Sequence, residues 1–407
     1  MKIVKILLVL AIAVGMTACN NEDVVDLSNL PESTISVRVV PGSDGPAVRS
    51  IGDLTGNGVL AVGLPAESAI KQLEVFVFAG ETPAGYGSAT STSSVTEVLD
   101  IATTAGSRSI FVVANAGINP VLSKTELLAK TRNLPANIAN GLPMTSNDTP
   151  VTLVAGKNQY GFTVDVGGHD ASAEQISAGV PLKVYRVNAR VAIVGATLAL
   201  ETADAALFDN LREVQVAMFN VPKETKLFGP ALDLAMNANY LYGEAWDSPL
   251  GTYVKDPASA EANVSFLDTT VTFPITAAAA AAPYYYVNEN TAVDSVEQMF
   301  IVLRGKTYKG ETAVVADGYF TDAAGYTYYP VWVNATKDGY SYTGNDTDTG
   351  DSQIRRNTQY NITLTIKHKG NPNIDPPVSA ILDVNVSVEP WAVVNQNVTW
   401  GTPVVAP

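Results

Sequence analysis

The chain has 407 residues, of which 46% are hydrophobic and 16% charged, so it has a globular composition with room for about two ordinary domains. The formal net charge of −15 excludes the basic surface that nucleic-acid binding requires. A single cysteine excludes an internal disulfide framework, and two histidines exclude a histidine-rich metal site. We therefore expect neither a metal nor a cofactor.

The N-terminus has the features of an exported lipoprotein. Two lysines precede an apolar run at residues 6–14, which is too short for a spanning helix of ~20 residues and is typical of a signal peptide. The next residues, Met16 to Cys19, resemble a bacterial lipobox, in which the cysteine thiol receives a diacylglycerol. We predict a signal peptide at residues 1–18 and lipidation of Cys19. The alternative is an ordinary secretory signal with an incidental cysteine.

Residues 33–40 read as a short strand, with Ile35, Val37 and Val39 on one face. The following loop is rich in glycine, proline, serine and aspartate, and it contains Arg49. Such a loop would be open to a protease. On the residues alone, a solvated surface charge explains Arg49 more simply.

The rest of the chain reads as many short strands with one helix. The helix is expected at residues 123–133, where Ser123 and Glu126 form a capping box. A low-complexity loop is expected at 80–94, and a small-residue linker near 169–181 marks a domain boundary. Residues 182–200 read as one long strand, with Arg186 and Arg190 on the same face. Further strands are expected at 71–78, 109–115, 151–154, 158–166, 212–221, 271–275, 299–303, 328–334 and 360–368. This pattern predicts an all-β protein built as a pair of sandwiches.

The C-terminal end holds two more candidate strands, separated by Pro390. In the first, Val384, Val386 and Val388 alternate with polar residues, as in a half-buried strand. The second has apolar side chains of its own. Strands at a chain end can pair either with their own sheet or with the sheet edge of another molecule, and we expect the second. The residues expected to contribute are Val384, Val386, Val388, Trp391, Val393, Val394, Val398 and Trp400.

Catalytic and metal-binding patterns are weak. His169 and Asp170 are neighbours without a nucleophile, which favours a solvated loop, and His368 beside two lysines is expected at the plain surface. The acidic run at 345–352 faintly resembles a calcium loop but lacks its glycine and glutamate spacing, so we expect a polar turn. The tyrosines at 284–286 and 326–329 could stack on sugars, although core packing is the commoner explanation. We therefore predict that the protein is not an enzyme.

Several segments, in order along the chain, resemble the major fimbrillins of Bacteroidales, which are FimA-like shaft subunits of type V pili. The matching runs are MTAC at 16–19, TISV at 34–37, LEVFVF at 73–78, AGSRSIFVVANAG at 105–117, AGKNQYGF at 155–162, LKVYRVNARVA at 182–192, LFGPALDLAMNANYLYG at 227–243, YTYYPVWVN at 326–334, IRRNTQYNITLTI at 354–366 and VEPWAVVNQNVTW at 388–400.

The resemblance implies two transthyretin-like β-sandwich domains, at residues 50–178 and 179–407, behind a lipidated propeptide at 19–49. It also implies cleavage between Arg49 and Ser50, departure of the strand that carries Ile35, Val37 and Val39, and its replacement by donor strands near 380–407. Arg38 is a rival cleavage site, but it lies inside the strand pattern. The tail at 401–407 extends past the usual end of the family and leaves the donor register open.

The implied partners are other copies of the chain, joined head to tail in a filament, together with minor anchor and tip subunits and an arginine-specific protease. The precursor would be held at the outer membrane by the lipid on Cys19, and the processed chain would join a surface fimbrium that supports adhesion and biofilm formation. The ligand on the opposing surface stays open. The alternatives are a tip or accessory adhesin of the same fold and a glycan-acting lipoprotein enzyme.

Overall fold

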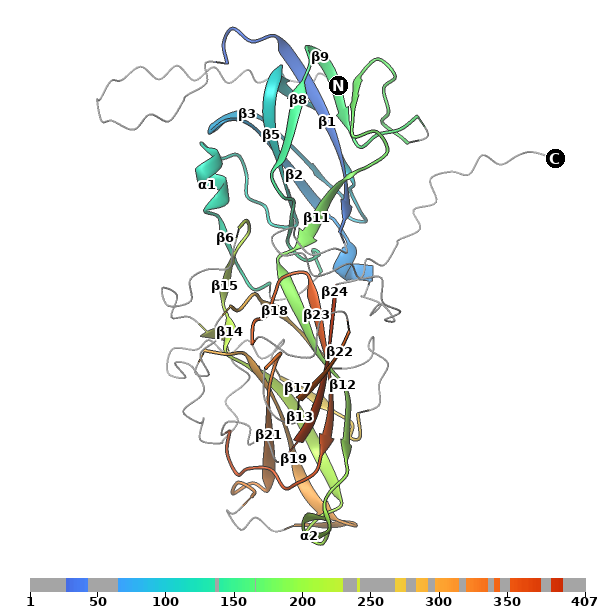
Figure 1. The fold of residues 1–407 in the computed structure, drawn as a ribbon, viewed down its shortest axis with the longest axis vertical. Helices are drawn as coiled ribbons and strands as arrows, with labels where there is room; N and C mark the ends of the chain where they lie inside the picture. Colours follow the sequence, from blue (N-terminus) through green and yellow to red (C-terminus); the bar gives the residue numbers. More distant parts are fainter. Residues whose placement is uncertain are drawn as a thin grey trace, which may run out of the picture.

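The computed structural model describes residues 27–42, 65–135, 139–164, 166–229, 240–241, 268–275, 283–291, 297–314, 320–335, 340–344, 352–374 and 382–390. The molecule is mostly β and has two domains placed end to end, the first at the top of Figure 1 and the second below it. Within the described ranges, no helix is long and apolar enough to cross a membrane.

The first domain is built around strand β1. Its strands follow the order β10-β9-β1-β11-β7-β5-β2-β3, with β4 added to β1 and β8 to β5. The elements are β1 (Glu32–Pro41), η1 (Pro65–Ser68), β2 (Gln72–Ala79), β3 (Thr82–Thr90), β4 (Glu97–Thr104), β5 (Gly106–Ala114), α1 (Lys124–Leu128), β6 (Thr131–Asn133), β7 (Met144–Thr145), β8 (Thr149–Leu153), β9 (Gly156–Tyr160), β10 (Glu174–Ile176) and β11 (Leu182–Arg186).

The second domain has two main sheets that enclose one core. One sheet has the order β18-β12-β23-β24-β22; the other has the order β17-β13-β19-β20, with β21 on β19. The elements are β12 (Asn188–Leu198), α2 (Thr202–Ala205), β13 (Asn210–Phe219), β14 (Val221–Pro222), β15 (Glu224–Lys226), β16 (Tyr240–Leu241), β17 (Asp268–Val271), β18 (Tyr284–Asn288), β19 (Phe300–Lys309), β20 (Thr312–Ala313), β21 (Tyr326–Trp332), β22 (Tyr340–Gly344), β23 (Thr358–Ile366) and β24 (Leu382–Pro390).

Two predictions for the first domain, one of a loop and one of a helix, need correction. The expected loop at 80–94 contains β3, whose glycines are needed because β4 lies so close: a Cβ on Gly85 would sit 2.7 Å from the Ala102 carbonyl oxygen. The expected helix at 123–133 is only the five residues of α1, although the Ser123 side chain caps it by accepting from the Glu126 amide as predicted.

The predicted long strand at 182–200 is two strands in different sheets. β11 joins the first domain by pairing with β1 and β7, and β12 begins the second domain after Val187. Alternation along the sequence continues across this point because both strands are buried, so periodicity alone cannot reveal the change of sheet. The expected domain boundary at residues 178 and 179 stays a prediction; the change of sheet lies at Val187.

Candidate assembly site

Strand β1 is a central part of the first domain. Ile35, Val37 and Val39 have no exposed surface and pack into the same apolar cluster as Val75 and Val112 of two other strands. The alternation seen in the sequence therefore reflects a strand with one face in the core. Removing it would uncover an apolar groove.

The two ends of β1 are held differently. Its first part lies between β4, which is antiparallel with six register pairs in all, and β9, which is parallel with five. Its last part pairs in parallel with β11 over three residues. At the first end, the Asn158 side chain, 1% exposed, donates to the Ser33 hydroxyl at 2.9 Å and to the Thr34 carbonyl at 3.1 Å. β1 thus bridges several neighbours, and its departure would break pairing with all of them.

A buried polar group lies where the two domains meet, and we call it the junction cluster. It combines η1 with residues of β11, β12, β18 and the turn before β23. Arg186 donates to the Glu67 carbonyl at 2.8 Å and to the Ser68 hydroxyl at 2.8 Å. The members of the junction cluster are Glu67, Ser68, Arg186, Arg190, Tyr286 and Asn357.

The carboxylate of Glu67 is the anionic centre of this cluster. The Tyr286 hydroxyl donates to it at 2.6 Å, and the Arg190 guanidinium lies 3.6 Å away. Glu67 and Arg186 are fully buried, and burial lowers the pKa of Arg186 to about 10, against the opposing pull of the Glu67 charge. Burial, followed by the charge of Glu67, raises the pKa of Tyr286 above its ordinary value. Both shifts follow from the burial of these side chains, and paired charges interact strongly in such an environment.

Two arginines of this cluster stand out in the sequence, but their partners do not. Arg186 and Arg190 were expected on one strand face; instead they lie on two consecutive strands, where Arg186 contacts the Glu67 backbone carbonyl and Arg190 lies near the Glu67 carboxylate. Nothing in the sequence around Glu67 or Asn357 marks them as special. The signal that could have found Glu67 is the pair of arginines itself, since two buried cations require an anion.

The predicted donor residues Val384, Val386 and Val388 lie on β24, inside the second domain. β24 pairs with β23 over nine antiparallel positions and with β22 over five parallel ones. In a single chain, β1 and β24 therefore belong to different sheets and are not brought together. The remaining predicted sites lie outside the described residues: Cys19, Arg49, Ser50, Trp391, Val393, Val394, Val398 and Trp400.

The other sequence candidates have structural explanations. Core packing is confirmed for four of the six tyrosines, Tyr285, Tyr286, Tyr328 and Tyr329, which are buried, while Tyr284 and Tyr326 are half-buried. The expectation of a plain surface position for His368 is wrong, because its Nδ1 lies 3.0 Å from an Asp204 oxygen and its side chain is only 30% exposed. The three aspartates of the acidic run, at positions 346, 348 and 351, lie outside the described residues. Among the residues that the structure does describe, no group of three or more metal-binding side chains is found.

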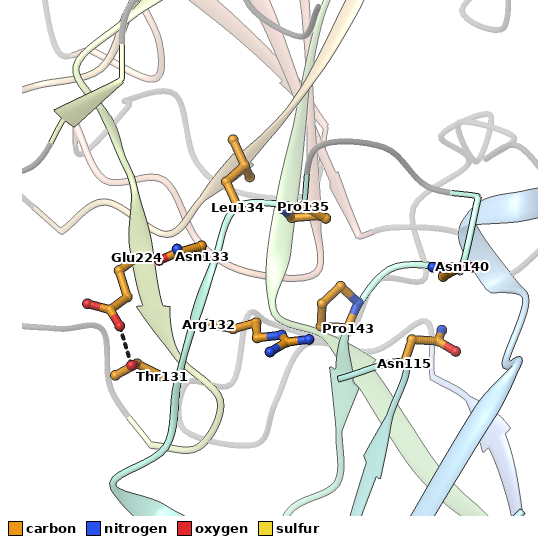
Figure 2. Close-up of a pocket in the computed structure, with 10 residues that line it drawn as sticks. Asn115, Thr131, Arg132, Asn133, Leu134, Pro135, Asn140, Pro143 and Glu224 are labelled. Carbon is orange, nitrogen blue, oxygen red and sulfur yellow. Dashed lines mark hydrogen bonds between the residues drawn. The ribbon is translucent and has the colours of Figure 1, made fainter. Parts of the chain in front are cut away.

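A polar cleft of about 490 Å³ opens at the domain junction, between β6 and the segment before β7. Figure 2 shows Arg132 pointing toward Pro143 and the hydrogen bond from Thr131 to Glu224. The Asn115 amide at its edge already donates to two carbonyls and accepts from two backbone amides. The described lining contains no histidine or cysteine.

Comparison with known proteins identifies the relatives of this chain. Residues 34–186 match the family model "Major fimbrial subunit protein (FimA)", and residues 188–391 match "FimA4 pilin C-terminal domain". A major fimbrium subunit FimA type-2 of Porphyromonas gingivalis is 32% identical over 98% of this chain and its own full length; a type-4 subunit of the same organism is 30% identical with the same coverage.

The fold agrees with these matches. The crystal structure of a fimbrilin (FimA) from P. gingivalis W83 superposes with a TM-score of 0.71 at 28% identity, covering 90% of this chain and 99% of that one. These relatives are structural subunits of fimbriae, not enzymes. The chain belongs to the FimA family of major fimbrial subunits.

Proposed function

We propose that this protein is the repeating shaft subunit of a surface fimbrium. It is exported as a lipoprotein precursor with the lipid on Cys19 and is cut between Arg49 and Ser50 by an arginine-specific protease. It then polymerises when the C-terminal segment of a neighbouring copy takes the place of β1. Each half of the subunit would be a transthyretin-like sandwich, and minor anchor and tip subunits would begin and end the filament.

The position of β1 is the observation that supports this proposal most directly. It is buried on the core side, pairs with β4, β9 and β11, and precedes Arg49 in the sequence. A cut at Arg49 would therefore detach a core strand from the rest of the chain. While β1 is in place, the groove is filled and premature assembly is blocked.

The energies make such an exchange workable. Burying Ile35, Val37 and Val39 stabilises the precursor by ~1.5–3 kcal/mol each, and an incoming strand with three β-branched side chains at the same spacing would recover a similar amount. Val384, Val386 and Val388 have that spacing. Because the donor and the groove lie on different parts of each subunit, the contact is head-to-tail and extends into a filament.

The donor can be one of two segments. If β24 itself is exchanged, it must leave nine register pairs with β23. If only the chain beyond Pro390 is exchanged, β24 stays in its own sheet, and Val394, Val398 and Trp400 supply the apolar side chains. Deletion of residues 395–407 tests the second version: we expect a folded, secreted subunit that forms no filaments. Normal filaments from this deletion would exclude the segment beyond residue 394 as the donor.

The whole proposal is tested by sequencing the N-terminus of protein sheared from cells, together with labelling of intact fimbriae. We expect Ser50 as the first residue and antibody labelling along the entire shaft. Labelling confined to the fimbrial end would assign the chain to the tip or accessory role. A mature chain that still contains residues 33–40 would contradict strand replacement.

A further inference from the structure

The chain on both sides of residues 43–64 ends in the same buried region. On one side, Gly42 follows β1 directly; on the other, Pro65 begins η1, which carries Glu67. Asn357 connects the two sides, because its side-chain oxygen accepts from Arg186 at 3.2 Å and its amide nitrogen donates to the Gly42 carbonyl at 3.5 Å. Any cut between Gly42 and Pro65 therefore leaves two chain segments, one ending after Gly42 and one leading into Pro65, and both contact the junction cluster.

These two ends are held with unequal strength. Gly42 makes neutral contacts: its amide donates to the Val184 carbonyl at 2.7 Å, and its carbonyl accepts the long bond from Asn357. The Glu67 carboxylate lies 3.6 Å from the buried Arg190 guanidinium, and the Glu67 backbone carbonyl accepts from the buried guanidinium of Arg186 at 2.8 Å. Charge-assisted contacts in a low-dielectric interior are much stronger than neutral ones. Withdrawing Glu67 would also leave two cations buried without it, which is strongly unfavourable.

Strand β1, on the side of Gly42, has its weakest pairing at its last residues, next to the cut. At its last residues β1 pairs in parallel only with β11, over three positions, and Val39 donates to the Thr96 carbonyl on the other side. At its first residues it has ladders on both sides and the bonds from Asn158. Opening of β1 is therefore easiest from Gly42.

We propose that the junction cluster is a one-sided anchor: after a cut between Gly42 and Pro65, Glu67 holds the mature side of the cut at the domain junction, while β1 separates starting from Gly42. Glu67 is thus a positioning residue for assembly, because it keeps the chain from Pro65 onward at the domain junction. The inference deepens the proposed function, on which it rests for the departure of β1. The anchoring itself requires only a cut in this segment.

The test uses the full chain with a site for a sequence-specific protease inserted between residues 50 and 60, so that it does not depend on Arg49. Hydrogen exchange is measured by mass spectrometry before and after the cut. We expect the amides of Val39, Val40 and Gly42 to exchange roughly tenfold faster after the cut, while those of residues 66–70 stay as protected as in the uncut chain. Equal loss of protection on both sides of the cut would overturn the proposal.

Glu67→Gln keeps the size and the acceptor oxygen but removes the charge. We expect the cut to expose residues 66–70 in this variant. The matched control is Glu74→Gln, since Glu74 is 1% exposed, accepts from the Ile118 and Asn119 amides and lies outside the junction cluster. In this control we expect the cut to leave residues 66–70 protected. If Glu67→Gln behaves like the control, the anchor does not exist.

Each variant is compared with its own uncut form, so that a general loss of stability cancels. If Glu67→Gln does not fold, Tyr286→Phe removes one donor to the same carboxylate, and we expect a smaller increase in exchange at residues 66–70 after the cut; no increase in that variant would also overturn the anchor. Failure of the proposed function gives a different result, since β1 would then be found inside assembled fimbriae whatever happens at Glu67.

Discussion

The first strands of the two domains, β1 and β12, occupy similar positions but have different attachments. Each has an antiparallel neighbour on one side, β4 for β1 and β18 for β12, and a parallel neighbour on the other. Each points β-branched side chains into its core. In Figure 1, β1 is the blue strand of the upper domain, and β12 is the yellow-green strand labelled in the lower domain. The same local design therefore serves one strand that we propose to be removable and one that is permanent.

The difference lies in the connections and in the parallel ladder. Only Val187 separates β12 from β11, so β12 is tied directly to the first domain, and its ladder with β23 has eight positions. The parallel ladder of β1 is divided between β9 and β11, and residues 42–64 lie between β1 and η1. β12 also carries Arg190, which faces Glu67. If β1 is removable as we propose, the difference from β12 lies in how each strand is connected and not in how well it is buried.

The largest effect is expected from preventing the cut, so that β1 stays joined to the chain as β12 does. Arg49→Ala should abolish fimbriae and trap the full-length precursor, because β1 can no longer be detached from the chain. Electron microscopy of cells and the mass of the cell-associated protein measure this outcome. Arg49→Lys is the matched control: it should also block an arginine-specific protease, and an added lysine-specific protease should restore assembly. Fimbriae made of uncut Arg49→Ala chains would refute the switch.

A pair of core substitutions compares the strands at different stages of assembly. Val37→Ala in β1 and Val191→Ala in β12 each remove two buried methyl groups and should each lower the free energy of unfolding of the precursor by about 2–3 kcal/mol. In assembled fimbriae only Val191→Ala should lower the temperature of dissociation, since β1 is then absent. Urea unfolding of the precursor and heating of purified fimbriae provide the two measurements. A similar loss of fimbrial stability in both variants would show that β1 is retained.

The strands, including β1, could be predicted from the sequence because burial of one face imposes a two-residue period. β3 was missed because its small residues reflect the close approach of β4, which is a tertiary fact. The Glu67 site was missed for the same reason: its hydrogen-bond partners Arg186 and Tyr286 are 119 and 219 residues away along the chain.

The family could be predicted because many segments match in order along the chain, and the comparisons confirm it. The processing sites Cys19 and Arg49 rest on short patterns in residues outside the described ranges, so they stay predictions. The donor segment is open for a physical reason: β24 already has partners on both sides in the single chain, and its sequence cannot tell whether it leaves them.

A smaller effect is expected at the polar side chains that hold each strand. Asn158 contacts the first end of β1, and Asn288 accepts from Asn188 of β12 at 2.7 Å. Replacing either by alanine should cost about 1–2 kcal/mol in the precursor. After a cut, only Asn158→Ala should speed the exchange of β1 for a labelled synthetic peptide of residues 31–42, as followed by native mass spectrometry. If Asn288→Ala speeds it equally, the bonds of Asn158 do not control the departure of β1.

The smallest expected effect is a pH dependence beside β1. Glu97 of β4 stands opposite Arg38 of β1, and burial raises the pKa of its carboxyl, although the charge of Arg38 opposes the shift. The pKa of Glu97 in the folded precursor therefore lies above the unfolded value of ~4.3. Between these two pKa values the folded state binds more protons than the unfolded state, so the free energy of unfolding falls as the pH rises through this range. Relative to wild type, Glu97→Gln should therefore gain stability between pH 4 and pH 7 in urea unfolding.

Asp170→Asn is the control, for which the expected change has the opposite sign. Lys157 and Ser172 lower the pKa of Asp170, so removing its charge should cost stability at pH 7 but not at low pH. A Glu97→Gln variant that loses stability relative to wild type as the pH rises would show that the attraction of Arg38 outweighs burial, and that this pair helps to hold β1 in place.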